Sequence, residues 1–93
     1  MRFEWDANKA SANLVKHRVS FGEATEVFYD PNAIEGFDAL HSVNEVRLFV
    51  FGLSTRRLLF VVYVEIPPDT VRIISARKVT KAERELYERR IIR

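Results

Sequence analysis

Two arginines on one short segment are the residues whose type and spacing point most directly to chemistry. Arg72 and Arg77 flank the run Ile-Ile-Ser-Ala, and Lys78 follows at once. A guanidinium is planar and permanently charged, and its paired N–H groups match the oxygens of a phosphate. The segment therefore predicts a phosphate-bearing partner, although an arginine at a strand end is also commonly a solvated or salt-bridged surface residue.

The spacing of these arginines sets a condition on a shared site. Side chains alternate between the two faces of a regular strand, so Arg72 and Arg77 point to opposite faces unless a bulge or the strand end intervenes. If Glu65 lies opposite Arg72 across the preceding turn, that pair is structural or orients the guanidinium toward a substrate. Arg77 with Lys78, beside Arg84, makes the better basic cluster.

Several kinds of catalytic centre are missing from the sequence. It has no cysteine, no Gly-rich phosphate loop and no Gly-x-Ser-x-Gly motif, and its two histidines, His17 and His41, do not have metal-ligand spacing. The acidic residues are scattered rather than paired. We therefore expect no cofactor and no metal site. RNA cleavage without a metal remains chemically accessible, because it needs a base, an acid and cations that stabilise the phosphorane.

Other residues could complete such a site. Lys16 and His17, at the end of the first predicted helix, and more weakly Tyr87, are candidates for proton transfer. Each also has an ordinary structural role: Lys16 would interact with the C-terminus of the helix dipole, His17 would be a half-buried histidine with its hydrogen bonds satisfied, and Tyr87 would be a core aromatic. The candidate RNA-binding residues are cations outside this set: Lys78, Lys81, Arg84 and Arg47.

The charges are distributed unevenly along the chain. Residues 23–45 include six acidic and no Lys or Arg residues, whereas residues 77–93 include seven basic and three acidic ones; the net charge is only +2. A basic face opposite an acidic one is typical of proteins that bind nucleic acid. The same polarity also suits a dimer or a protein partner.

Length and composition predict one folded domain over residues 1–93, since 47% of the residues are hydrophobic and 30% charged. The longest apolar run, from Leu58 to Val64, is too short to span a membrane. The first residues lack the apolar core of a secretion signal, so we expect a cytoplasmic protein.

The elements that must position these residues follow from local patterns. A short strand at Phe3 precedes a helix that Asp6 caps and that runs from Ala7 to about His17, with Ala10, Leu14 and His17 along one side. The later elements are a helix from the capping box Ser20–Glu23 to before Asp30-Pro31, a weak edge strand within 32–38, strands 46–51, 58–65 and 71–77, and a helix from the capping box at Thr80.

This order predicts an α+β fold of two layers, with an antiparallel sheet of three to four strands, two N-terminal helices and a C-terminal helix. Strand 58–65 is apolar on both faces and should be central. The helices should cover one face of the sheet and leave the other for a ligand.

Motifs at both ends of the chain resemble those of one known family. The matching residues are Phe3-Glu4-Trp5-Asp6, Lys9, Asn13, Lys16-His17, Val19-Ser20-Phe21, Ala24, Phe28, Asp30-Pro31, Glu45-x-Arg47, Gly52, Leu59 to Tyr63, Arg72 to Lys78, Thr80-Lys81, Glu83-Arg84 and Tyr87-Glu88. This combination is similar to that of the BrnT ribonuclease toxins of type II toxin–antitoxin systems. The chain departs from the family at Arg18, where glycine is favoured, at Asn44, where glycine is common, and at Ile66, where arginine is usual.

The resemblance implies a compact RelE-like fold, RNA cleavage, growth arrest and neutralisation by a cognate antitoxin. The antitoxin would be a ribbon-helix-helix DNA binder in a 2:2 complex, and operator DNA would be contacted only through it. One alternative is a catalytically weak or inactive binding module that acts mainly in a complex repressing its own operon. A second, a plain RNA-binding domain, lacks the exposed paired aromatics usual in single-strand platforms.

Overall fold

The computed structural model describes residues 1–42 and 44–92 and contains a sheet, three α-helices and two short 3-10 turns. The strands are β1 Arg2–Glu4, β2 Ile34–Phe37, β3 Leu48–Leu53, β4 Leu58–Ile66 and β5 Thr70–Lys78. The helices are α1 Ala7–His17, α2 Phe21–Glu26 and α3 Lys81–Ile92, and the 3-10 turns are Val27–Tyr29 and Ala39–His41.

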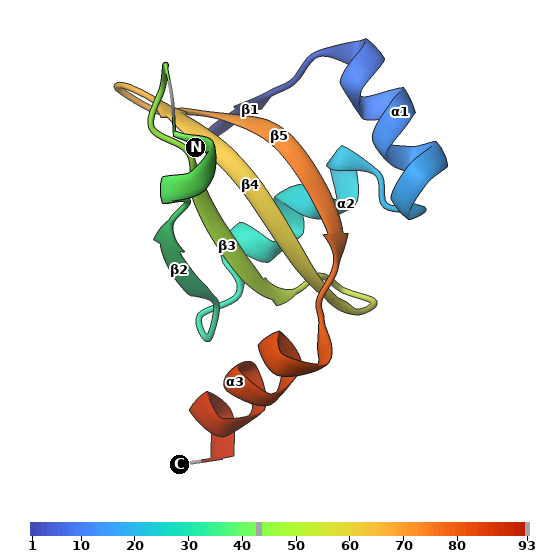
Figure 1. Ribbon diagram of the computed structural model, residues 1–93, viewed down its shortest axis with the longest axis vertical. Coiled ribbons are helices and arrows are strands. Elements are labelled where there is room, and N and C mark those ends of the chain that lie inside the picture. The colour runs from blue at the N-terminus through green and yellow to red at the C-terminus, as the bar shows by residue number, and fades with distance from the viewer. Residues whose placement is uncertain (43, 93) are drawn as a thin grey trace.

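The five strands form one mixed sheet in the order β1-β5-β4-β3-β2 (Figure 1). The weak edge strand predicted within 32–38 is confirmed as β2, which pairs antiparallel with β3. The predicted sheet of three to four antiparallel strands was too small, because β1 joins the other edge parallel to β5. Three residues carry too little pattern to predict a pairing with a strand almost seventy positions away. The prediction that β4 is central is confirmed.

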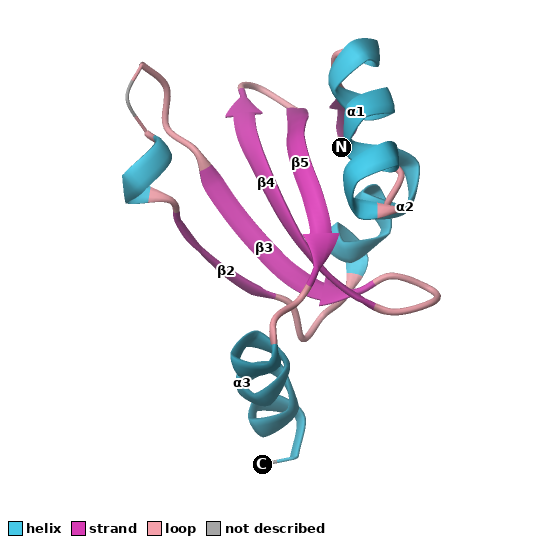
Figure 2. Ribbon diagram, turned by 45° about the vertical axis from the view of Figure 1, so that its right-hand side comes forward, coloured by secondary structure: helices cyan, strands magenta, loops and turns pink. Residues whose placement is uncertain are grey.

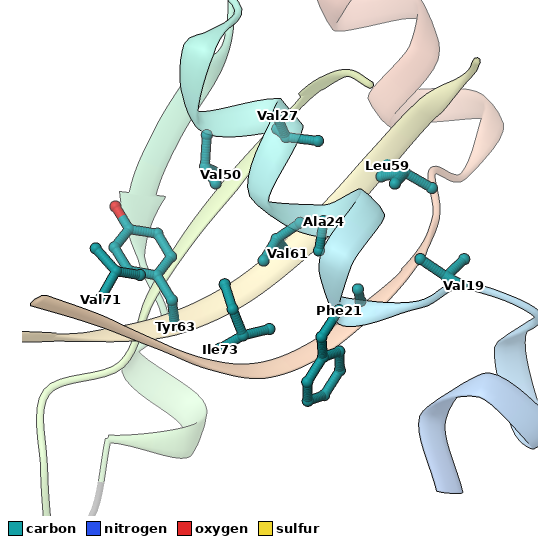
Figure 3. Packing of buried hydrophobic residues seen from close by; sticks show 11 residues of the cluster. Val19, Phe21, Ala24, Val27, Val50, Leu59, Val61, Tyr63, Val71 and Ile73 are labelled. Carbon is teal, nitrogen blue, oxygen red and sulfur yellow. The ribbon is translucent and has the colours of Figure 1, made fainter. Parts of the chain in front are cut away.

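Helices α1 and α2 lie together on one side of the sheet (Figure 2). Beneath them Phe21 and Val27 pack on Leu59, Val61 and other buried residues of the main core, as Figure 3 shows. The predicted second helix is α-helical only to Glu26 and then tightens into the 3-10 turn.

Helix α3 does not join this layer, so the expectation that all helices cover one face was wrong. It projects from the end of the sheet where β5 finishes (Figure 1). Its Tyr87 is buried against Phe51 and Leu58, which point away from α1 and α2. In the middle of this second face Phe60 and Val62 are half-buried.

Helix α1 begins where predicted, because the Asp6 side chain accepts a hydrogen bond from Lys9 N at 2.9 Å. Its buried residue is Asn13, whereas Leu14 is 49% exposed, which corrects the predicted apolar side. The Asn13 amide donates to Ala76 O at 2.8 Å and to Val19 O at 2.9 Å, and its oxygen accepts from Ala76 N at 3.2 Å. The side chain therefore pairs with β5 beyond the last residue of β1, as a neighbouring strand would.

Helix α1 ends at His17, and the residue that caps it, Arg18, has a left-handed φ of 60°. This conformation favours glycine, so the arginine at this position carries a steric cost.

Arg18→Gly is expected to raise the free energy of unfolding by about 1 kcal/mol, because it removes the steric cost of the left-handed conformation. Urea unfolding measures the change. The control Lys16→Gly, at an exposed position inside the same helix, should lower stability by about 1 kcal/mol. If the two glycine substitutions change the free energy of unfolding equally, the left-handed conformation of Arg18 has no steric cost.

Each helix among residues 1–42 and 44–92 is too short or too polar to span a lipid bilayer.

Candidate active site

A β-bulge decides where the two arginines point. In the β4–β5 pairing Val62 lies opposite Ser75 and Tyr63 opposite Ile73, so Ile74 is an extra residue with no partner. Arg72 then lies opposite Val64, and Arg77 lies opposite Phe60. Opposed side chains share a face, and alternate residues of β4 share a face.

Both arginines are therefore on the same face of the sheet, the one away from α1 and α2. The odd spacing in the sequence would separate them on a regular strand, but the bulge restores a common direction. This is the geometric condition for a shared site.

Arg77 is held by three hydrogen bonds and by a contact with an aromatic ring. Its Nη1 and Nη2 donate to the two oxygens of Glu83 at 2.9 and 3.0 Å, and Nη1 also donates to Lys78 O at 3.0 Å. Its guanidinium carbon lies 4.2 Å from the ring centroid of Phe60. Among the described contacts, Nε–H and one N–H of Nη2 stay available, which is the side-on fork that binds a phosphate.

Glu83 also caps α3, as the predicted capping box requires. It accepts from Thr80 N at 2.8 Å, and its own N–H donates to Thr80 Oγ1 at 3.2 Å. Burial raises the pKa of Glu83, but hydrogen bonds from Arg77 and Thr80 outweigh it and hold the pKa below its ordinary value. Arg77 thus connects the sheet to the first turn of α3.

Arg72 pairs with Glu4 of β1 rather than with Glu65, which lies opposite Val71. Its Nε and Nη2 contact the same Glu4 oxygen at 2.8 and 2.7 Å. Both side chains are nearly half exposed, at 47% and 45%. Such a pair contributes at most about 1 kcal/mol, so a phosphate can displace it or share the guanidinium.

A groove of about 330 Å³ opens beside Arg77 on this face. It is lined by Asp38, Arg47, Phe60, Val62, Ile74, Ser75 and Arg77. Arg47 Nε is buried and makes no hydrogen bond within the described part of the chain, and it lies 3.5 Å from Glu45 Oε1, which is an ion-pair distance only. The groove thus brings Arg47 and Arg77 together; we define it as the arginine groove.

The other predicted residues lie outside this groove. Lys16 is exposed and His17 half-buried at the end of α1, and within residues 1–42 and 44–92 no hydrogen bond or ion pair joins them to an arginine of the groove. Three cations are exposed around the junction of β5 and α3: Lys78, Lys81 and Arg84. The side chain of His41 lies outside the described part of the chain.

Tyr87 is 2% exposed and donates to Asp30 Oδ2 at 2.6 Å. Burial and the neighbouring Asp30 carboxylate both raise the pKa of Tyr87 above its ordinary value. Asp30 also accepts from Leu53 N at 2.7 Å, and a Cβ on Gly52 would lie only 2.7 Å from Asp30 Oδ2. Tyr87 therefore fastens α3 to the sheet. The sequence signal for Asp30 was its place before Pro31, which marked only a helix end.

Acid is expected to destabilise the fold through Asp30 and Glu83. Burial raises the pKa of Asp30, but hydrogen bonds from Leu53 N, Tyr87 and Asn32 N lower it below its ordinary 3.8. A carboxylate with a depressed folded pKa stabilises fully above its unfolded pKa, and this stabilisation is lost as pH falls through the folded value.

The free energy of unfolding should therefore stay level above about pH 5 and fall below about pH 4. Urea unfolding at several pH values measures it, and Asp30→Asn should weaken the dependence because the amide does not titrate. Stability unchanged down to about pH 3 would contradict this prediction.

Among the residues that the structure describes, no three His, Asp or Glu side chains are grouped so that they could hold a metal ion.

Comparison with known proteins identifies the family. The sequence model described as "Ribonuclease toxin, BrnT, of type II toxin-antitoxin system" matches residues 5–83. The chain belongs to the BrnT family. It is thus a ribonuclease toxin of a type II toxin–antitoxin system by family, as the sequence motifs predicted.

A solved structure supports the fold. The chain is similar to the Brucella abortus ribonuclease toxin BrnT, with a TM-score of 0.66, 19% identity, and coverage of 87% of this chain and 99% of that one. No curated relative matches the chain in sequence. The RelE-like description and the single domain over residues 1–93 stay predictions.

Proposed function

We propose that this BrnT chain is an endoribonuclease that cleaves RNA without a metal ion, using guanidinium groups to stabilise the transition state. One observation carries the proposal: the bulge at Ile74 turns Arg72 and Arg77 onto one open face. The side chains around the arginine groove include two guanidiniums and a hydroxyl, which suit a phosphodiester.

In the proposed reaction the 2′-oxygen attacks the adjacent phosphorus and the bond to the 5′-oxygen breaks. Arg77 binds the phosphorane through its side-on fork, and Arg72 binds a flanking phosphate. The RNA backbone is bound by the exposed cations Lys78, Lys81 and Arg84, and by Arg47 in the groove.

Lys16 and His17 are proposed to transfer protons. Asn13 fastens α1 to Ala76, the residue before Arg77, and Lys16 and His17 follow Asn13 by three and four positions on the same side of the helix. Tyr87 stays the weakest candidate because its hydroxyl is committed to Asp30.

RNA cleavage is expected to survive EDTA and to leave a 2′,3′-cyclic phosphate or its hydrolysis product at the 3′ end. The reason is that cationic side chains take the charge-stabilising role that metals play in other nucleases. Gel assays of purified protein, with the product ends mapped, measure this outcome. Activity lost in EDTA and restored by Mg²⁺ would refute the proposed mechanism.

We further propose that the toxin acts in the cytoplasm, arrests growth and is neutralised by its cognate ribbon-helix-helix antitoxin in a 2:2 complex. Helix α3 offers a surface for the antitoxin. Its Leu86 and Ile91 are 49% and 48% exposed and lie beside Arg89 and Arg90. Such a face suits an acidic amphipathic segment. The mass of the complex with the adjacent gene's product tests the stoichiometry.

A second candidate is a binding module with weak or no catalysis, which acts mainly in the repressor complex. It is favoured by the fact that both arginines already have carboxylate partners, Glu4 and Glu83. Inducing the chain alone in a bacterial host separates the two candidates, since only the ribonuclease degrades RNA and stops growth.

A further inference from the structure

A second groove, of about 450 Å³, lies where the chain leaves β1 and enters α1. Trp5, the only tryptophan of the chain, lines it and is 40% exposed. The ring contacts Phe21 edge-to-face, with the centroids 6.0 Å apart. A large exposed aromatic in a groove is a stacking surface for a flat ligand. We call this space the tryptophan groove.

The two grooves meet at the bulge. Ile74, the unpaired residue of β5, lines both the tryptophan groove and the arginine groove. Arg72 lines the first and Arg77 the second, so a strand that crosses Ile74 passes from one arginine to the other. The tryptophan groove therefore continues the proposed RNA site.

The polar groups of the tryptophan groove carry both signs of charge. Arg72 donates Nε–H and one Nη2–H to Glu4, so three of its five N–H groups remain for a ligand. The exposed Lys9 ammonium has no described partner. Each carboxylate also keeps one oxygen without a described partner, because Glu4 uses only Oε2 and Asp6 only Oδ2. The cations suit a phosphate, and the carboxylate oxygens suit N–H donors of a base.

We propose that the tryptophan groove binds one nucleotide of the RNA next to the cleaved phosphate. The base stacks on Trp5, the phosphate lies on Arg72 and Lys9, and the free oxygens of Glu4 and Asp6 favour a base with an exocyclic amino group. The proposal rests on the proposed ribonuclease function, since it extends the same RNA path.

Because the chain has a single tryptophan, its fluorescence reports on this groove alone. A fluorescently labelled 2′-O-methyl oligocytidine, which cannot be cleaved, is titrated into the full chain while polarisation and tryptophan emission are followed. We expect both signals to change with one dissociation constant. A polarisation change with constant tryptophan emission would overturn nucleotide binding in the tryptophan groove but leave RNA binding by the chain standing. No change in either signal would overturn both proposals.

The base preference is tested with oligouridine, whose base has a carbonyl in place of the amino group of cytosine. We expect oligocytidine to bind at least about threefold more tightly, as one hydrogen bond to a carboxylate allows. Equal dissociation constants would remove the proposed roles of Glu4 and Asp6.

Substitutions separate stacking from folding. Trp5→Leu should weaken binding at least about fivefold, the low end of one lost base stack, whereas Trp5→Phe should stay within about twofold. Tyr29→Leu is the matched control, because Tyr29 is 66% exposed but lines neither groove. Lys9→Ala, at an exposed position, should weaken binding and reduce its salt dependence by about one counterion. Unchanged binding by Trp5→Leu and Lys9→Ala, with circular dichroism intact, would overturn the proposal.

Discussion

Replacing Arg72 or Arg77 by alanine is expected to slow RNA cleavage by about a hundredfold or more. Arg77 contacts the phosphorane, and a cation that acts mainly in the transition state contributes about 2 to 4 kcal/mol to lowering the barrier. Arg72 acts on the same barrier by holding the flanking phosphate, which keeps the cleaved phosphate in position for attack. The initial rate on a defined RNA measures the loss, and growth after induction reports it in cells. Arg72→Ala is the cleaner variant, because its half-exposed pair with Glu4 adds little to stability.

Arg77→Ala needs a structural control, because it also leaves the Glu83 side chain, which is only 18% exposed, without its partner. Arg57→Ala provides that control. Arg57 binds Glu23 through two hydrogen bonds of 3.0 and 2.8 Å, and neither residue lines the arginine groove. It should lower stability and leave cleavage by the folded protein unchanged. If Arg57→Ala and Arg77→Ala slow cleavage equally, or if both arginine variants stay fully active, the arginines of the site are structural.

Asn13→Ala is expected to lower the free energy of unfolding by about 2 to 4 kcal/mol, because it leaves several buried backbone groups without a partner. These groups are Ala76 N–H and the carbonyls of Ala76 and Val19. Urea unfolding measures the loss, and hydrogen exchange at Ala76 should accelerate.

Asn8 offers the matched control in the same helix. It is exposed, so Asn8→Ala should be neutral or raise stability by about 0.5 kcal/mol through helix propensity. A similar small effect at Asn13 would show that water replaces the amide and that the edge of β5 does not need it.

The sequence predicted best what depends on neighbouring residues. The bounds of α1 agree with the prediction from Asp6, and the capping box at Thr80 forms in both directions. At Ser20 the side chain caps α2 by accepting from Glu23 N, but the Glu23 carboxylate binds Ser54 and Arg57 instead of closing the box. Strand β4 is central because its side chains are apolar on both faces.

Features set by distant residues were not predictable in the same way. The parallel pairing of β1, the clamp from Asn13 to Ala76 and the Asp30–Tyr87 bond each join segments far apart in the sequence. For the site, the arginines themselves were identified from residue chemistry. Their common direction was not, because it depends on which residue of β5 is left unpaired against β4.

The unpaired Ile74 makes the site respond differently to lost and gained residues. Arg72 and Arg77 are an odd number of positions apart and share a face only because one position does not count in the pairing. A strand shortened by that one residue pairs regularly and still presents both guanidiniums together. A strand lengthened by one keeps both on one face only if its register against β4 slips by two residues or a second residue goes unpaired; otherwise one of them turns toward the core. In this segment deletions are therefore the mild change in chain length and insertions the disruptive one.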